Sequence, residues 1–425
     1  MTPHTNPSPL LRVVSADEVS RERRAPVDPE TLGAAGGIVE SVRVDGIDAV
    51  RRYAEQFGER GTDQALVLGR AEMDAAAGSL DPDDLGVLER TAARIESFAK
   101  AQLDAIGEID VPVPGGRAGH TVEPVQSAGC YAPAGRYPLP SSVLMTAVTA
   151  RVAGCDRVIV ASPGADPVML AAASVAGADA FLAVGGAHSI AALAYGIDGL
   201  DPVDAIVGPG NRWVTAAKQL VSGVVGIDML AGPSELLIIA DETADARLVA
   251  ADLLAQAEHD DDARACLVTT SDALRHKVER KLQDQLERLP TAATARVALR
   301  NGFACLVPDI DAAIRVSDRI APEHLEIMVA DAPGVAQRVR HAGAVFIGSG
   351  TPEALGDYGA GPNHTLPTGG TARFRAGLSV ASLLRLRTWL RIDERQQAGG
   401  LMHDTRRLAS MEGLAAHEAS IRLRV

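Results

Sequence analysis

The sequence predicts an α/β protein with two Rossmann-like, doubly wound parallel-sheet domains and helical extensions at its N- and C-termini. Short apolar runs alternate with helical patterns through the middle of the chain, which is typical of βαβ units. Several of these runs end in glycine turns, as strands do at the ligand-binding edge of such sheets. The 425 residues exceed what one simple core requires, so we expect two to three domains.

The first half of the chain supplies helices and then strands. Apolar residues at three- and four-residue spacing predict amphipathic helices at residues 30–59 and 84–103. Three strands that end in glycine turns follow at 157–164, 180–189 and 204–214, and each leads into a helix. Backbone N–H groups at such turns can approach a phosphate, which indicates a nucleotide site. A G-x-G-x-x-G motif is absent, so the turns do not identify the nucleotide.

The second half of the chain repeats the alternation. Residues 234–259 predict a strand, an acidic turn and a buried helix, and residues 264–282 predict another strand and helix. The segment 357–374 is a long loop of Gly, Pro and Thr that also contains Asp and His. Loops that carry such side chains are often functional, so we interpret this one as part of a site.

Composition argues against several classes of protein. Hydrophobic residues make up 47% of the chain and charged residues 23%, which indicates a packed globular protein. A net charge of −14 without a basic cluster argues against nucleic acid as a partner. The sequence has no apolar run suited to a signal peptide, and none that reaches the roughly 20 apolar residues of a membrane span. We therefore expect a cytoplasmic protein that acts on a small molecule.

The cysteines give no sign of a metal or redox site. Cys130, Cys155, Cys266 and Cys305 are far apart and lie in apolar surroundings. Their spacing fits neither a zinc ribbon nor a redox pair. We interpret them as small buried thiols, with a nucleophilic role as the alternative.

Polar side chains gather where predicted elements end. Gln256 and His259 lie three residues apart on the buried helix, which places both on one face. Further imidazoles and carboxylates stand at other junctions: Glu323 with His324, Asp357 with His364, and Glu412 with His417. Such nitrogen and oxygen donors suit zinc. No pair has H-E-x-x-H spacing, so spacing alone leaves polar surface loops as the alternative interpretation.

Six segments together resemble the histidinol dehydrogenase family. They are GPGN (208–211), GIDMLAGPSE (226–235), DLLAQAEHD (252–260), APEHLEI (321–327), GDYGAGPNHTLPTGGTARF (356–374) and EGLAAH (412–417). They occur in the family's order. The resemblance implies oxidation of L-histidinol to L-histidine through a bound aldehyde, in the last steps of histidine biosynthesis, with two NAD and one zinc ion.

The resemblance also implies which residues bind zinc and substrate. The implied zinc ligands are Gln256, His259, Asp357 and His417. One carboxylate among neutral ligands leaves positive charge on the zinc, which chiefly positions the substrate. The implied substrate contacts are these four ligands together with Ser234, His324, His364 and Glu412.

Two neighbouring residues divide the implied chemistry. His324 is the expected general base for the alcohol, because imidazole takes up a proton near pH 7. The second oxidation requires water to add to the aldehyde, and Glu323 is expected to deprotonate that water.

The implied domain plan has four parts. Residues 1–28 form an N-terminal helical segment, and 29–128 with 236–380 form a Rossmann-like domain that carries most zinc and catalytic residues. Residues 129–235 form an inserted Rossmann-like, NAD-binding domain, and 381–425 form a C-terminal helical tail. The tail is expected to complete a neighbouring subunit's site, so that a homodimer has shared active sites.

The implied NAD contacts are Tyr131, His188 and Asn211. The family has Gln where this chain has His188, and one imidazole nitrogen cannot both donate and accept as an amide does. A second departure is Arg136 in AGRYPLPSSVLM. Arg136 is either a solvated loop charge or, as in relatives that oxidise sulfonated diols, a partner for a sulfonate. The alternative function is therefore oxidation of another primary alcohol, such as a sulfonated diol.

A third hypothesis is a nucleotide-binding relative that has lost catalysis. The complete set of six zinc-binding and catalytic residues argues against it, since drift would have replaced at least one: Gln256, His259, Glu323, His324, Asp357 and His417.

Overall fold

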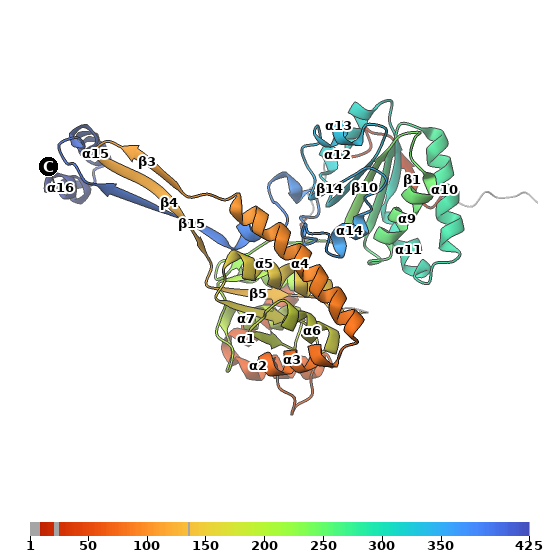
Figure 1. Cartoon of the computed structure of the whole chain (residues 1–425), viewed down its shortest axis with the longest axis horizontal. Helices are drawn as coiled ribbons and strands as arrows, with labels where there is room; N and C mark the ends of the chain where they lie inside the picture. The colour runs from red at the N-terminus through yellow and green to blue at the C-terminus, as the bar shows by residue number, and fades with distance from the viewer. Residues whose placement is uncertain (1–8, 21–24, 135–136, 425) are drawn as a thin grey trace, which may run out of the picture.

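The structure is a computed structural model that describes residues 9–20, 25–134 and 137–424. Figure 1 shows two α/β bodies and a narrow arm that projects away from them, with the last helices at the tip of the arm. Each body contains a six-stranded sheet, and the arm contains a three-stranded sheet. The predicted α/β class with parallel sheets is confirmed.

The first sheet has the strand order β2 (Val67–Leu68), β7 (Ala180–Leu182), β6 (Arg157–Ala161), β5 (Ser127–Tyr131), β8 (Ala205–Val207) and β9 (Gly226–Ile227). β2 is antiparallel to β7, and the other pairs are parallel. Every residue of β5 and β8 is buried, as expected for strands covered on both faces. The chain runs from β5 out to β7 and returns to β8, so a switch point lies between β5 and β8.

Helices cover both faces of the first sheet. On one face lie α5 (Pro140–Ala153) and α6 (Pro167–Val175), with α3 (Arg70–Ser79) and α4 (Pro82–Asp104) packed against them. On the other face lie α1 (Pro29–Asp45), α2 (Ile47–Gln56), α7 (Gly186–Tyr195) and α8 (Arg212–Val221). α1 begins where the Asp28 side chain accepts a hydrogen bond from the Thr31 N–H and a proline follows, which is a favourable helix start.

The second sheet is entirely parallel. Its order is β1 (Arg12–Val14), β12 (Phe303–Leu306), β11 (Arg264–Thr269), β10 (Glu235–Ala240), β13 (His324–Met328) and β14 (Ala344–Ile347). One face is covered by α9 (Ala246–Ala257), α10 (Asp272–Leu286) and α11 (Ala292–Ala298), and the other by α12 (Ile310–Ile320) and α13 (Ala332–Ala336). The switch point of this sheet lies between β10 and β13.

The arm joins distant parts of the chain. Its strands are β3 (Ile109–Val113), β4 (Gly116–Pro124) and β15 (Leu384–Ile392), all antiparallel. The helices α15 (Gly399–Met411) and α16 (Ala415–Arg422) pack together at its tip (Figure 1). A side chain at Gly119 would place its Cβ 2.0 Å from the Ile109 carbonyl oxygen, so the close approach of β3 and β4 requires glycine there.

The structure differs from the expected domain plan in three places. The N-terminal segment 1–28 contributes β1 to the second sheet, whereas we expected a helix. The helices of 29–128 pack on the first sheet, whereas we expected them beside 236–380. The tail 381–425 begins with strand β15 before its helices. An apolar stripe predicts that a helix has a buried face, but it does not say which sheet that face meets.

The expected burial of the four cysteines is confirmed: Cys130, Cys155, Cys266 and Cys305 are all buried and unpaired. Burial raises the pKa of Cys155 and of Cys266 to about 11, so both thiols are protonated at neutral pH. The described part of the chain contains no helix with the length and hydropathy of a membrane span.

Candidate active site

The candidate site is a cleft between the two α/β bodies. A cavity of about 440 Å³ is lined by Pro133 and Pro209 from the loops after β5 and β8. Ser234, Glu323 and His324, which stand at the starts of β10 and β13, line the same cavity. The carboxyl edge of the first sheet therefore meets the amino edge of the second. The first sheet turns the carboxyl side of its switch point to the cleft, whereas the second sheet contributes the starts of β10 and β13.

The end of α9 presents the first two expected ligands. α9 begins where the Asp245 side chain accepts from the Arg247 N–H, and it ends at Ala257. Gln256, near its end, is 0% exposed, and neither of its amide atoms has a hydrogen-bond partner in the described structure. His259 follows in the turn, with its side chain 41% exposed. A buried amide without a partner is costly, so the Gln256 side chain is suited to a ligand that the protein itself does not supply.

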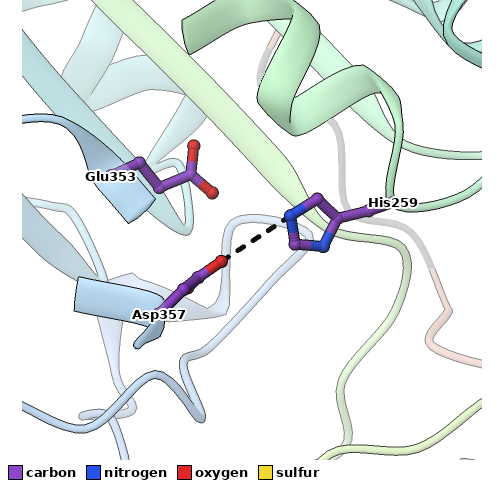
Figure 2. A group of neighbouring side chains, drawn as sticks. All are labelled: His259, Glu353 and Asp357. Atoms are coloured by element: carbon purple, nitrogen blue, oxygen red, sulfur yellow. Dashed lines mark ion pairs between the residues drawn. The ribbon is translucent and has the colours of Figure 1, made fainter. Parts of the chain in front are cut away.

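His259 faces two carboxylates of the short helix α14 (Glu353–Asp357). Its Nε2 lies 3.6 Å from Asp357 Oδ2. Figure 2 shows that the side chains of His259, Glu353 and Asp357 point toward one space, and their donor atoms lie within 4.8 Å of one another. Nitrogen and carboxylate donors at this spacing fit a zinc ion after small side-chain movements. α14 also packs against α9, which carries Gln256.

Glu353 is a site residue that the sequence analysis missed. It is 3% exposed, and burial raises its pKa well above the usual value, with a further contribution from the Asp357 carboxylate. The available signal was spacing, because residues four apart in a helix lie on the same face and Glu353 precedes Asp357 by four.

The fourth expected ligand, His417, lies on α16 at the tip of the arm, and Glu412 ends α15 beside it (Figure 1). Neither residue lines the cleft of its own chain. The structure thus brings together His259 and Asp357 beside the end of α9, but not His417 or Glu412.

His324 has the geometry of a base. Its Nδ1 lies 3.2 Å from the Glu235 carbonyl oxygen and 3.2 Å from Glu353 Oε1, two groups that accept hydrogen bonds. Nδ1 therefore carries the proton. Nε2 makes no hydrogen bond within the described residues, lies 3.8 Å from Asp357 Oδ1 and keeps its lone pair. Burial lowers the pKa of His324, so the imidazole is neutral at pH 7.

Glu323 is held in place from two sides. Ser234 Oγ donates to Glu323 Oε2 at 2.6 Å, and the Glu235 N–H donates to the same oxygen at 2.9 Å. Burial raises the pKa of Glu323 to about 7, which places its loss of a proton in the neutral range. Ser234 was expected to contact substrate, and it lines the cleft beside this carboxyl group.

His364 forms the wall behind the expected ligands. Its Nδ1 lies 2.9 Å from the Asp357 carbonyl oxygen, and its Nε2 lies 3.1 Å from Ser142 Oγ. Burial lowers its pKa, so it is a neutral side chain that lines the cavity. This placement is compatible with the expected substrate contact and ties α5 to the 357–374 loop.

The expected NAD contacts lie at the carboxyl edge of the first sheet. Tyr131 and His188 are 2% and 1% exposed, and the Gly186 N–H donates to the Tyr131 hydroxyl oxygen at 3.3 Å. The His188 Nε2 lies 2.9 Å from Glu59 Oε2, a partner that the sequence did not indicate. Asn211 caps α8 and is exposed. None of the three expected contacts lines the cleft itself, and Arg136 lies outside the described residues.

Two doubly wound sheets that enclose histidines and carboxylates in a shared cleft are typical of an α/β enzyme. The family model for histidinol dehydrogenase matches residues 22–425. The chain belongs to the histidinol dehydrogenase family, which consists of NAD-dependent oxidoreductases.

Curated relatives and solved structures agree with this assignment. The chain is 43% identical to a histidinol dehydrogenase of Cereibacter sphaeroides over 404 residues, which covers 93% of this chain and 92% of the relative. It is 44% identical to one of Thermus thermophilus over 416 residues, covering 97% and 100%. The crystal structure of histidinol dehydrogenase from Elizabethkingia anophelis superposes with a TM-score of 0.91 at 28% identity, covering 99% of both chains.

Proposed function

We propose that this chain oxidises L-histidinol to L-histidine through L-histidinal, as the last steps of histidine biosynthesis. In each of two steps a hydride passes to NAD⁺, and water enters in the second step, so that one alcohol, one water and two NAD⁺ give one carboxylic acid, two NADH and two protons. The observation that carries the proposal is the neutral His324, whose Nε2 makes no hydrogen bond within the described residues, beside Glu323 and the His259–Asp357 pair, in a chain that matches the family over residues 22–425.

The proposed metal is one zinc ion per subunit, held by Gln256, His259, Asp357 and a His417. When bound, zinc supplies a fixed positive charge that orients the amine and imidazole of the substrate. The fit rests on the buried, unpartnered Gln256 amide and on the converging His259 and Asp357 donors.

The protein's own residues divide the proton transfers. His324 Nε2 accepts the proton of the substrate hydroxyl as hydride leaves the carbinol carbon. Glu323, in its carboxylate form, accepts a proton from the water that adds to the aldehyde, and the second hydride then leaves the hydrated carbon. Ser234 holds the Glu323 carboxyl group in place, and His364 closes the wall behind the substrate.

The proposed assembly is a homodimer with shared sites, in which the arm of one chain delivers Glu412 and His417 to the cleft of the other. The tip of the arm exposes apolar side chains, with Leu408, Met411 and Leu414 at 57%, 71% and 43%. The segment 381–425 contains eight arginines and five acidic residues in a chain of net charge −14. A segment that is basic and partly apolar suits the acidic body of a second copy.

Oxidation of another primary alcohol, such as a sulfonated diol, is the second candidate. Tyr137, which directly follows Arg136, lines the cleft. An arginine at that segment would favour a sulfonated substrate over a cationic one.

A substrate panel decides between the two candidates. Purified enzyme with zinc and NAD would be given histidinol, a sulfonated diol and a plain diol, with NADH formation followed by absorbance. We expect kcat/KM for histidinol to exceed that for either diol, with two NADH per histidinol. Preference for the sulfonated diol would assign the alternative function, and inactivity on all three alcohols would contradict both.

The zinc site has a simple test in His259→Ala. We expect this variant to lose bound zinc and to keep its thermal unfolding midpoint, because the side chain is 41% exposed and packs no core. Metal analysis of the purified protein measures the first effect. His276→Ala, at an ion-paired histidine on α10 whose side chain is 58% exposed, is the matched control and should retain zinc. Full zinc occupancy in His259→Ala would rule out the ligand role.

A further inference from the structure

A pair of carboxyl groups, Glu326 buried and Asp252 half-buried, lies behind the proposed metal-binding residues. Glu326, on β13, is 1% exposed, and its Oε1 accepts a hydrogen bond from the backbone N–H of Glu353 at 2.7 Å. That N–H belongs to the first residue of α14. Glu326 also follows His324 by two residues, so both side chains leave the strand on the same face. Glu326 thus connects the strand of the proposed base to the helix that carries Asp357.

The second oxygen of Glu326 accepts no hydrogen bond from an N–H or hydroxyl group of the described residues. Its neighbour is instead the carboxyl group of Asp252, on α9, and the two side chains hydrogen-bond to each other. Burial and the Asp252 charge raise the pKa of Glu326 to about 8, and burial raises the pKa of Asp252. Two ionised carboxylates in contact repel each other, and a hydrogen bond between two carboxyl groups requires a proton on one of them, so one proton is shared between Glu326 and Asp252.

The contact of Asp252 with Glu326 and the contact of Glu326 with Glu353 together form a bridge from α9 to α14. Each end of this bridge lies one helical turn from a proposed zinc ligand. Asp252 precedes Gln256 by four residues on α9, and Glu353 precedes Asp357 by four on α14 (Figure 2). Residues four apart lie on the same face of a helix. A displacement of α9 relative to α14 would therefore break the bridge and separate the ligands together.

We propose that Asp252 and Glu326 are positioning residues, joined by a proton-sharing hydrogen bond, that hold α9 and α14 at the separation that zinc requires. The inference rests on the proposed zinc site and adds two residues that do not contact the metal. Supporting groups behind metal ligands commonly contribute 10- to 100-fold in metal affinity.

Matched variants test the bridge through zinc affinity, measured by competition with a chelator on the full-length protein. Glu326→Leu removes both hydrogen bonds, and we expect it to weaken zinc binding about 10- to 100-fold. Glu326→Gln keeps both, because its amide oxygen accepts from Glu353 and its amide N–H donates to Asp252, so we expect affinity near wild type. Asp252→Ala and Asp252→Asn form a second pair at a half-buried position. We expect Asp252→Ala to weaken zinc binding as Glu326→Leu does, and Asp252→Asn to keep zinc affinity near wild type as Glu326→Gln does.

Asp241→Leu is the control for general destabilisation. Asp241 is 9% exposed and accepts the Ala330 N–H at 2.9 Å, but it lies at the opposite, carboxyl edge of the same sheet. We expect it to lower the unfolding midpoint without changing zinc affinity. Wild-type zinc affinity in both Glu326→Leu and Asp252→Ala would overturn the inference. Failure of the proposed zinc site itself would show separately, as no zinc bound by the wild-type protein.

Discussion

Replacing His324 with Asn is expected to lower the rate of alcohol oxidation by about 100- to 10,000-fold, the range for loss of a general base. The variant keeps the fold, because the Asn amide can donate to the Glu235 carbonyl oxygen that Nδ1 contacts now. It removes the Nε2 lone pair, which accepts no hydrogen bond in the described structure. Zinc content and histidinol binding should therefore stay near wild type, so the loss should appear in kcat.

Single-turnover measurements of the two half-reactions would check this result. With histidinol as substrate, His324→Asn should be slow, whereas with histidinal the defect should be smaller. Glu323→Gln provides the reciprocal comparison, because it removes the carboxylate expected to deprotonate water, and it should impair histidinal oxidation more than alcohol oxidation. Equal losses in both half-reactions for both variants would contradict the division between the two residues.

The central strands of the two bodies, such as β10 and β11, were predictable because they are buried on both faces. Residues 234–240 and 264–270 form short, nearly continuous apolar runs between polar turns, and no alternative element fits such runs as well. The arm was not predictable in the same way. β3 and β15 are mostly exposed, and β4 pairs with a strand about 260 residues away, so neither burial nor a local turn marks the pairing.

The site shows the same division between local and long-range information. His324 and Glu323 were found because imidazole and carboxylate stand together at the start of a strand, and the structure places both in the cleft. Glu353 and Glu326 were not found, because a glutamate at a helix start and one in a strand look like ordinary cap and core residues until folding brings Asp252 and Asp357 beside them.

The largest expected effect on activity concerns the arm, because the arm places His417 away from the cleft that contains His259 (Figure 1). If the arm completes a second copy's site, His259→Ala and His417→Ala are each inactive as homodimers, since every site lacks one ligand. In a mixed dimer of the two variants, one site combines both damaged residues. The other combines an intact His259 from one chain with an intact His417 from its partner.

We therefore expect mixed dimers to regain about half of the wild-type activity and about one zinc ion per dimer, as two-fold symmetry requires. Co-expression with two different affinity tags would isolate them, and metal analysis with an NADH assay would measure both quantities. Homodimers of each variant, carried through the same two-tag purification, set the background. The mixed dimer contains the same two substitutions as the inactive parents. It differs only in that both substitutions fall in one site, so any regained activity reports which chain supplies His417 to each site. Mixed dimers no more active than the parents would mean that His417 serves the cleft of its own chain, which would require the arm to fold back onto its own body.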